Sequence, residues 1–99
     1  MVYKIKVNRR FEVKVAKTYE FIVKEWGYSV GDAFYTRLLN KLNILQKQPF
    51  IGKISTKRPA IRRVLLEKYN IIYYYIDRDT IVLVNFLNSK KNPKRNPYD

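Results

Sequence analysis

The stretch Tyr69–Asp77, YNIIYYYID, decides the fold of this chain together with Thr80–Leu87, TIVLVNFL, which follows it closely. Both runs are rich in β-branched and aromatic residues, which suit a pleated, half-buried surface. Because almost every position is apolar, the runs are typical of central strands that are covered on two faces. A short charged link, Asp77–Asp79, joins them, so the sequence predicts a hairpin with a loop of about three residues.

The residues before this hairpin predict one strand and two helices. At residues 3–7, YKIKV alternates apolar and lysine residues, as a half-buried strand does. Two helical faces follow, and we expect their apolar members to lie in the core. These members are Val15, Tyr19, Ile22 and Trp26, and then Phe34, Leu38, Leu42 and Leu45. Gly27 is predicted to end the first helix and Ser29 to cap the second, which makes the pair an antiparallel hairpin.

The segment between the helices and the β-hairpin predicts a turn, a loop and a further strand. Pro49–Gly52 is typical of a turn, Lys53–Pro59 of a polar loop, and Ile61–Leu66 of a strand. The predicted order is therefore β-α-α-β-β-β. It is an α+β fold in which an N-terminal helical hairpin packs on one face of a curved, mainly antiparallel sheet. Residues 1–99 are expected to form a single domain, with residues 88–99 as its basic C-terminal tail.

The composition restricts the chemistry of this protein. Its 21 Lys and Arg residues outnumber 8 Asp and Glu, and a net charge of +13 attracts nucleic acid, an acidic protein or an anionic surface. The chain has neither cysteine nor histidine, which excludes disulfides, thiol chemistry and histidine-based metal sites. No two carboxylates have the spacing of a metal or glycosidase pair, so we predict neither a metal nor a cofactor. No apolar run approaches a membrane span and no signal peptide is recognisable, so we expect no membrane partner.

Three basic clusters are the candidate contact sites. The first belongs to the N-terminal strand and helix and is interpreted as a solvated face. It consists of Lys4, Lys6, Arg9, Arg10, Lys14 and Lys17. The second contains no acidic residue and is either an anion site or a solvated loop with one structural ion pair. It consists of Lys53, Lys57, Arg58, Arg62 and Arg63.

The third basic cluster follows the last predicted strand directly, so the sheet fixes its origin. It consists of Lys90, Lys91, Lys94 and Arg95. This cluster is either a contact surface or disordered terminal charge.

Alternation along the strands divides several side chains between the two faces of the sheet. Neighbouring strand residues point to opposite faces, so Arg62 and Arg63 cannot share one face. We expect one of the two to form a structural ion pair, with Asp77 or with a helix carboxylate. The same rule places the phenol rings of Tyr73–Tyr75 on both faces, where they either pack the sheet or stack on bases.

Several motifs occur in a fixed order along nearly the full chain. They are the early strand YKIKV, the helical hairpin, Pro49-x-x-Gly52, Ile61-Arg62, Tyr69-x-Ile71-x-Tyr73 and a final strand leading into Ser89–Pro93. In this order and spacing the chain resembles the RelE/ParE superfamily of small bacterial toxins from type II toxin–antitoxin systems. The resemblance implies a cytoplasmic toxin that a cognate antitoxin neutralises. It also implies that the antitoxin wraps the toxin with an extended, acidic and partly disordered segment.

The superfamily divides by target, and the chain departs from the nuclease branch at two positions. Nuclease members commonly carry an arginine after the tyrosine that matches Tyr69, where this chain has Asn70. They also carry a tyrosine soon after the last strand, which is missing here. Arg63 and Lys90 match basic positions of that branch. The resemblance therefore favours the ParE-like branch, whose members lack the nuclease set and poison DNA gyrase.

The favoured hypothesis is a toxin that binds and inhibits DNA gyrase through its basic surface. The target-binding residues would be Arg62, Arg63, Lys90, Lys91, Lys94 and Arg95, with a secondary basic loop of Lys53, Lys57 and Arg58. The alternative is a RelE-like endoribonuclease that cuts mRNA on the ribosome without metal. Its catalytic residues would be Arg63, Lys90, Lys91 and Tyr98, of which Tyr98 lies close to the end of the chain. A third hypothesis is a non-toxic module that binds nucleic acid with the same positive surface.

Overall fold

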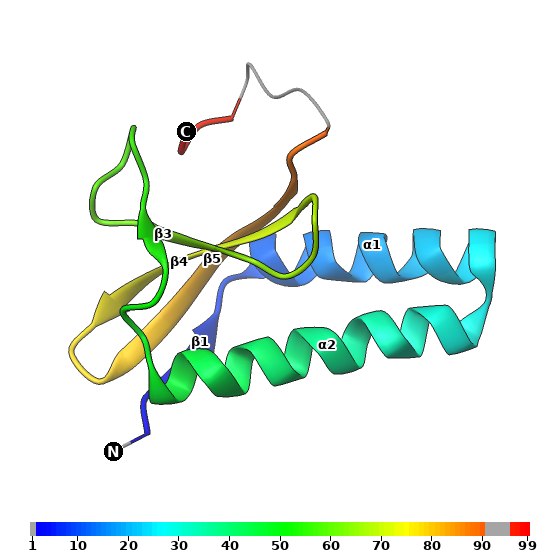
Figure 1. The fold of residues 1–99 in the computed structure, drawn as a ribbon, viewed down its shortest axis with the longest axis horizontal. Coiled ribbons are helices and arrows are strands. Elements are labelled where there is room, and N and C mark those ends of the chain that lie inside the picture. The colour runs from blue at the N-terminus through cyan, green and yellow to red at the C-terminus, as the bar shows by residue number, and fades with distance from the viewer. Residues whose placement is uncertain (1, 91–95) are drawn as a thin grey trace.

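The computed structural model of this protein describes residues 2–90 and 96–99. Two antiparallel helices lie against one face of a five-stranded sheet (Figure 1). The elements are β1 (Lys4–Val7), α1 (Arg9–Trp26), α2 (Tyr28–Lys47), β2 (Lys53–Ile54), β3 (Arg62–Leu65), β4 (Asn70–Asp77) and β5 (Thr80–Asn88). The sheet order is β1-β5-β4-β3-β2, with β1 parallel to β5 and the other neighbours antiparallel. The predicted α+β fold, with a helical hairpin on one face of a mainly antiparallel sheet, is confirmed.

The predicted β-hairpin forms the centre of the sheet. Strands β4 and β5 pair along their whole length, from Asn70 opposite Asn88 to Asp77 opposite Thr80. The connecting loop is therefore two residues long, one fewer than predicted, because Asp77 is itself a ladder residue. Arg78 in this loop has a φ of 56°, a left-handed conformation that tight hairpin turns require.

Alternation along β4 places the aromatic residues of the hairpin in two cores, and β5 has a bulge opposite them. Tyr73 lies opposite Asn85 and Tyr74 lies opposite Leu83, which leaves Val84 as the extra residue. Tyr74 enters the core beneath the helices, whereas Tyr73 joins a smaller cluster on the other face of the sheet. The predicted alternation of Tyr73 and Tyr74 is thus confirmed, and both rings are fully buried.

The helical hairpin confirms most of the predicted core, and one prediction about it is wrong. Val15, Phe34, Leu38 and Leu45 are buried in the main core. Trp26, also predicted there, is 62% exposed, because the tip of the hairpin extends past the sheet and finds nothing to cover it (Figure 1).

The turn between the helices is tighter than the sequence analysis predicted. α2 begins at Tyr28, directly after Gly27, whose φ is 93°. Ser29 therefore lies inside α2 and does not cap it, and no side-chain hydrogen bond caps this end. A single residue in a glycine-favoured conformation is enough to reverse the chain.

One strand was missed altogether. Lys53 and Ile54, predicted as part of a polar loop, pair with Arg63 and Arg62 and form the edge strand β2. Two residues are too few to show a period, so the sequence gives no strand signal there. The strand follows the Pro49–Gly52 turn, and a buried phenol holds this turn in place by hydrogen bonds to its main chain.

That phenol is the side chain of Tyr74. Its hydroxyl donates to Pro49 O at 2.8 Å and accepts from Gly52 N at 2.9 Å. A Cβ atom on Gly52 would collide with this hydroxyl, so the turn needs glycine for close approach. Within the part of the chain that the structure describes, no helix is long and apolar enough to cross a membrane.

Candidate functional site

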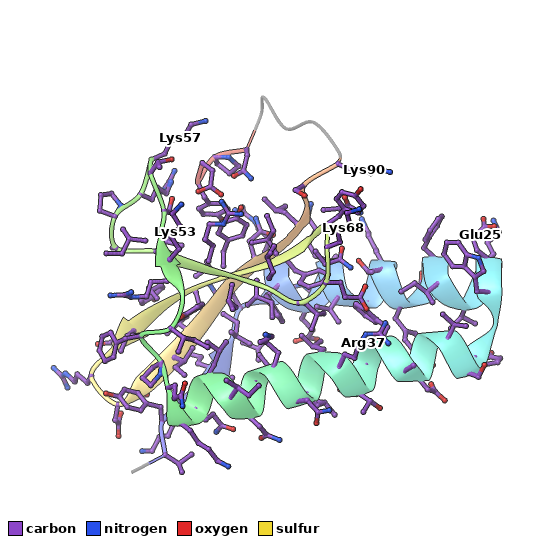
Figure 2. All side chains as sticks on the ribbon, viewed as in Figure 1. Glu25, Arg37, Lys53, Lys57, Lys68 and Lys90 are labelled. Carbon is purple, nitrogen blue, oxygen red and sulfur yellow. The ribbon has the colours of Figure 1, made fainter. Side chains whose placement is uncertain are left out.

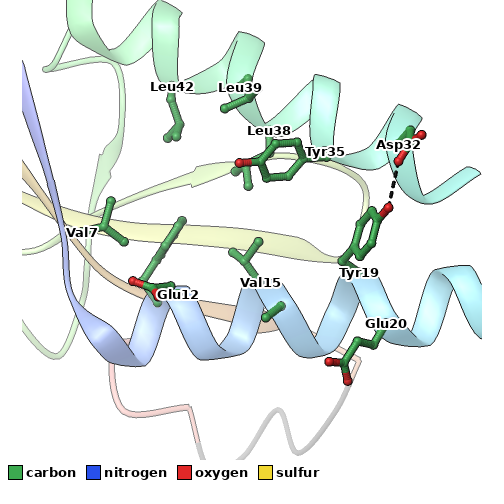
Figure 3. Close-up of a pocket in the computed structure, with 12 residues that line it drawn as sticks. Val7, Glu12, Val15, Tyr19, Glu20, Asp32, Tyr35, Leu38, Leu39 and Leu42 are labelled. Carbon is green, nitrogen blue, oxygen red and sulfur yellow. Dashed lines mark hydrogen bonds between the residues drawn. The ribbon is translucent and has the colours of Figure 1, made fainter. Parts of the chain in front are cut away.

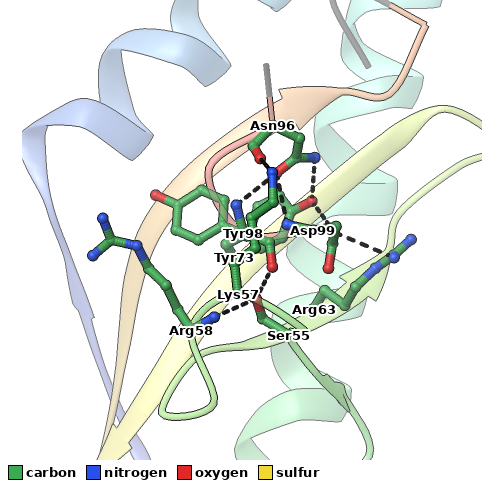
Figure 4. Close-up of polar contacts among 8 residues, drawn as sticks. All are labelled: Ser55, Lys57, Arg58, Arg63, Tyr73, Asn96, Tyr98 and Asp99. Carbon is green, nitrogen blue, oxygen red and sulfur yellow. Dashed lines mark hydrogen bonds and ion pairs between the residues drawn. The ribbon is translucent and has the colours of Figure 1, made fainter. Parts of the chain in front are cut away.

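The C-terminal segment Asn96–Asp99 lies on the sheet face that the helices leave open (Figure 4). Tyr98 stacks on Tyr73 with ring centroids 4.2 Å apart and an interplanar angle of 23°. Its side chain is only 5% exposed, and its hydroxyl accepts a hydrogen bond from Asn85 Nδ2 at 3.2 Å. The sequence predicted a basic tail here, but its last residues are part of a second core.

The β2–β3 loop holds this segment by its main chain. Lys57 N donates to Tyr98 O at 3.0 Å, and Ser55 Oγ donates to the same oxygen. Lys57 Nζ donates to Asn96 O at 2.7 Å. Ser55 is itself buried, so these bonds tie the loop and the chain end together in a protected place.

An acid at the chain end neutralises one of the predicted site arginines. Asp99 Oδ2 lies 3.3 Å from Arg63 Nη1 and accepts a hydrogen bond of 2.8 Å from the Tyr73 hydroxyl. Asn96 Nδ2 donates to the same hydroxyl at 3.0 Å. Burial, reinforced by the bond to Asp99, raises the pKa of Tyr73 to about 12, so its phenol stays protonated at neutral pH.

Arg62 has a different structural role on the opposite face. Its Nη1 donates to Gly52 O at 2.8 Å and to Phe50 O at 3.3 Å, and its guanidinium lies 5.2 Å from the Phe50 ring centroid. One of the two arginines does form a structural ion pair, as predicted, but the predicted partner, Asp77 or a helix carboxylate, is wrong. Arg63 pairs with the C-terminal Asp99 instead, and Arg62 binds main-chain carbonyls of the turn before β2.

The other predicted basic residues fall into two places. Lys53 pairs across the ladder with Arg63 and so shares its face, while Lys57 and Arg58 lie on the adjoining loop. Lys90 lies beyond the end of β5, where its Nζ is 4.7 Å from the Tyr69 ring centroid. In Figure 2, Lys53 and Lys57 lie on one side of the C-terminal segment and Lys90 on the other.

Three members of the predicted contact surface cannot be placed. They are Lys91, Lys94 and Arg95, which lie outside the described residues. Of the residues that can be placed, the structure brings Arg63 and Tyr98 to one site and puts Arg62 and Lys90 elsewhere.

A cleft that the sequence analysis missed lies between α1 and the end of β5. Its volume is about 860 Å³, and it is lined by Lys14 and Lys17 of α1 and by Lys90, which is far from them in sequence. We call this the basic cleft; its polar and aromatic members include Lys14, Lys17, Phe21, Trp26, Asn70 and Lys90. Lys14 and Lys17 were interpreted as part of a solvated face, and nothing in their local sequence connects them with Lys90.

A second hollow, of about 790 Å³, lies between α1 and α2 (Figure 3). We call this the apolar groove; its lining includes Val15, Tyr35, Leu38, Leu39 and Leu42. Three acidic residues border it, Glu12, Glu20 and Asp32. Tyr19 OH donates to Asp32 Oδ1 at 2.8 Å, and this bond raises the pKa of the Tyr19 phenol. Among residues 2–90 and 96–99, no group of three acidic residues could hold a metal ion.

A family comparison identifies the kind of protein to which these features belong. Residues 5–93 match the family model described as the ParE toxin of the type II toxin–antitoxin system parDE. The chain belongs to the ParE toxin family. A search of curated proteins gives no match.

Solved structures agree with this family on the fold. One similar chain comes from a structure described as the chromosomal ParDE toxin–antitoxin system from P. aeruginosa. It superposes with a TM-score of 0.75 at 16% sequence identity, and the match covers 88% of this chain and 96% of that chain. This ParE toxin family member therefore shares its backbone arrangement with that protein while most of its side chains differ.

Proposed function

We propose that this ParE family toxin acts in the cytoplasm by binding and inhibiting DNA gyrase, and that a cognate antitoxin neutralises it. The choice of gyrase as the target rests on the intramolecular contacts of Arg63 and Tyr98. Both are candidate catalytic residues of the competing nuclease hypothesis, and both are already engaged within the molecule.

Metal-free cleavage of RNA needs cations that stabilise the developing phosphorane charge and a group that moves protons. Asp99 neutralises Arg63, which leaves less positive charge for a phosphate there. Tyr98 is stacked and buried, and Tyr73 beside it keeps its proton until a pH of about 12. Lys90 lies at a separate place beyond β5. This arrangement supports a toxin that acts by binding a protein.

The proposed gyrase contact surface is the basic C-terminal region and the strand edge beside it. It comprises Arg63, Lys90, Lys91, Lys94 and Arg95, with the loop residues Lys53, Lys57 and Arg58 as a secondary contact. Arg62, which the sequence also predicted for this surface, is left out because it lies on the opposite face of the sheet and binds the turn before β2. Since Arg63 also has a structural role, we expect the lysines after β5 to contribute most of the binding.

The test compares two purified targets side by side. The toxin is incubated with gyrase, ATP and supercoiled plasmid, and separately with translating ribosomes. The proposal predicts linear plasmid after detergent and protease treatment, and no new mRNA 5′ ends. New 5′ ends without linear plasmid would establish the nuclease hypothesis instead.

A matched pair of variants tests the contact surface in cells. The first replaces four cations after β5 with alanine, at Lys90, Lys91, Lys94 and Arg95. The control removes the same charge elsewhere, at Lys6, Lys24, Lys41 and Lys47. We expect the first variant to lose toxicity and the control to keep it. If growth arrest survives in the first variant, the assignment of this surface is wrong.

The apolar groove is the proposed docking site of the antitoxin. Leu39 and Tyr35 are about half exposed there, which leaves apolar surface in water between two helices. The acidic residues Glu12 and Glu20 border it, although the chain as a whole is strongly basic. These features suit an amphipathic segment with an apolar face and basic edges. A remaining acidic segment of the antitoxin would contact the cationic surface outside the groove.

A further inference from the structure

We infer that the basic cleft between α1 and the end of β5 binds single-stranded nucleic acid. This inference goes beyond the proposed action on gyrase and does not depend on it. It rests on three observations about the cleft: its charge, its aromatic residues and its amide groups.

The charge of the cleft is positive and unpaired. Lys14, Lys17 and Lys90 line it, and no acidic residue does. Among the residues that the structure describes, no carboxylate lies within ion-pair distance of these three lysines. Glu67 accepts from Asn70 Nδ2 at 3.3 Å, but its charge is paired with Arg37. Phosphate groups are the anions for which three separated ammonium groups along a surface are suited.

Besides the buried Phe86, two aromatic residues of the cleft are largely exposed to water. Phe21 is 55% exposed and Trp26 is 62% exposed, and their rings meet edge to face with centroids 5.8 Å apart. Burying them elsewhere would have stabilised the fold, so their exposure at a lined cleft indicates a binding role. Bases of any sequence can stack on such rings.

The lysines and the aromatic residue Phe21 follow one another along one face of α1. Lys14, Lys17 and Phe21 are spaced by three and four residues, which aligns them on one side of α1. Trp26 lies twelve residues beyond Lys14, about 18 Å along the helix axis. A single nucleic-acid strand lying along this distance would place phosphate groups near the lysines at one end of the cleft and bases near the aromatic rings at the other.

The chain on the far wall supplies hydrogen-bonding groups. Asn70, Asn88 and Asn96 line the cleft. The Asn96 amide already bonds the Tyr73 hydroxyl, Tyr98 N and Asp99 N, so Asn70 and Asn88 are the candidates to bond base edges. The carboxylates of an acidic peptide would bind the lysines, but they have no planar base to stack on Phe21 and Trp26 and no base edge to bond the amides.

The test uses Trp26, which is the only tryptophan in the chain. The full toxin is titrated with oligothymidylate of about 12 nucleotides, a typical site size for such binders. We expect quenching of the Trp26 fluorescence as bases stack. The logarithm of the binding constant should fall with the logarithm of salt with a slope of about −2 or steeper, since each of three phosphates contributes about −0.7. Oligouridylate in a parallel titration distinguishes RNA from DNA as the preferred strand.

Matched variants locate the binding. Lys14→Ala with Lys17→Ala should weaken binding at least about tenfold and reduce the slope by about 1.4. Lys41→Ala with Lys47→Ala removes the same charge from α2 and should change affinity less than about threefold. Phe21→Ala keeps the fluorophore and should also weaken binding about tenfold through lost stacking.

Three results would overturn the inference. One is the absence of quenching by either oligonucleotide at low salt. Another is polyglutamate of matched charge binding as tightly as the oligonucleotides, which would mean that the cleft recognises acidic protein. The last is an equal loss of affinity in the α2 control variant, which would show that binding reflects net charge alone.

Discussion

The two sides of α1 differ more than any other neighbouring surfaces of this toxin. On one side, the apolar groove is lined by leucines and bordered by Glu12 and Glu20. On the other, the basic cleft carries Lys14 and Lys17 and no acidic residue. Residues two apart on a helix lie about 200° apart around its axis, so Glu12 and Lys14 face nearly opposite directions. One helix can thus present two different chemistries to two different partners.

The apolar groove and the basic cleft are also built from different parts of the chain. The apolar groove depends only on the helices and β1, which are close in sequence. The basic cleft depends on contacts between the beginning and the end of the chain, because Asn96 and Pro97 form part of its wall. Changes at the C-terminus should therefore affect the cleft and leave the groove intact.

The largest effect expected from this difference comes from Tyr98→Ala. It removes a buried ring that stacks on Tyr73, which should lower the free energy of unfolding by about 3 kcal/mol. The released chain end should also weaken oligonucleotide binding, whereas antitoxin binding in the groove should persist. Urea unfolding and the two binding constants measure this. Equal loss of both binding activities would contradict the separate construction of the two sides.

A charge placed in the apolar groove should give the next largest effect. Leu39→Asp puts a carboxylate on an apolar surface that is only half exposed, which should weaken antitoxin binding by about 2 to 3 kcal/mol, roughly 30- to 150-fold. The control is Leu65→Asp, since Leu65 on β3 is similarly exposed, at 48%, and is not part of the groove lining. Calorimetry with the cognate antitoxin provides the measurement. The groove is not the docking site if the Leu65 variant loses as much affinity as the Leu39 variant.

Reversing the charge of the acidic residues that border the apolar groove should have a smaller effect on antitoxin binding. Glu12→Lys with Glu20→Lys should weaken antitoxin binding by about 1 kcal/mol, roughly fivefold, mainly through a slower association rate. Association rates at two salt concentrations, measured by stopped flow, show whether the effect is electrostatic. A faster association would mean that the segment in the groove is acidic and not basic at its edges.

The last prediction concerns the phenol that anchors the C-terminal segment, whose effect is confined to alkaline pH. Tyr73 ionises near 12 in the folded toxin and near 10 when unfolded, so the unfolded chain loses this proton first as the pH rises. Stability from Tyr73 is therefore complete below pH 10 and falls by about 1 kcal/mol per pH unit between pH 10 and 12. Tyr73→Phe should lack this contribution, while the lysines titrate alike in both proteins. Urea unfolding of the two proteins at several alkaline pH values measures the difference, and parallel curves would contradict the assignment.

The sequence predicted what local periodicity encodes. The runs that became β4 and β5, and the apolar faces with Val15 and Phe34, carry a strong two-residue or helical period, and the structure confirms them. The strand β2 was not predicted because two residues are too few to show a period. Trp26 was wrongly predicted to be buried because a helical period does not show where the sheet that would cover it ends.

The site was less predictable because its residues meet only in three dimensions. Arg63 was expected to pair with Asp77 or a helix acid, yet Asp99, at the end of the chain, reaches it. Lys14 and Lys90 are separated by most of the sequence, and neither shows by itself that the other lies across a cleft. The total charge predicted an anionic partner, but only the fold shows which cations gather and which are neutralised.

The most direct test of the division across α1 is to measure both binding constants on two variants. The account predicts that Leu39→Asp loses antitoxin binding and keeps oligothymidylate binding. It predicts that Lys14→Ala with Lys17→Ala loses oligothymidylate binding and keeps antitoxin binding. A variant that loses both activities, or two variants that lose the same one, would contradict the assignment of two partners to the two sides of this helix.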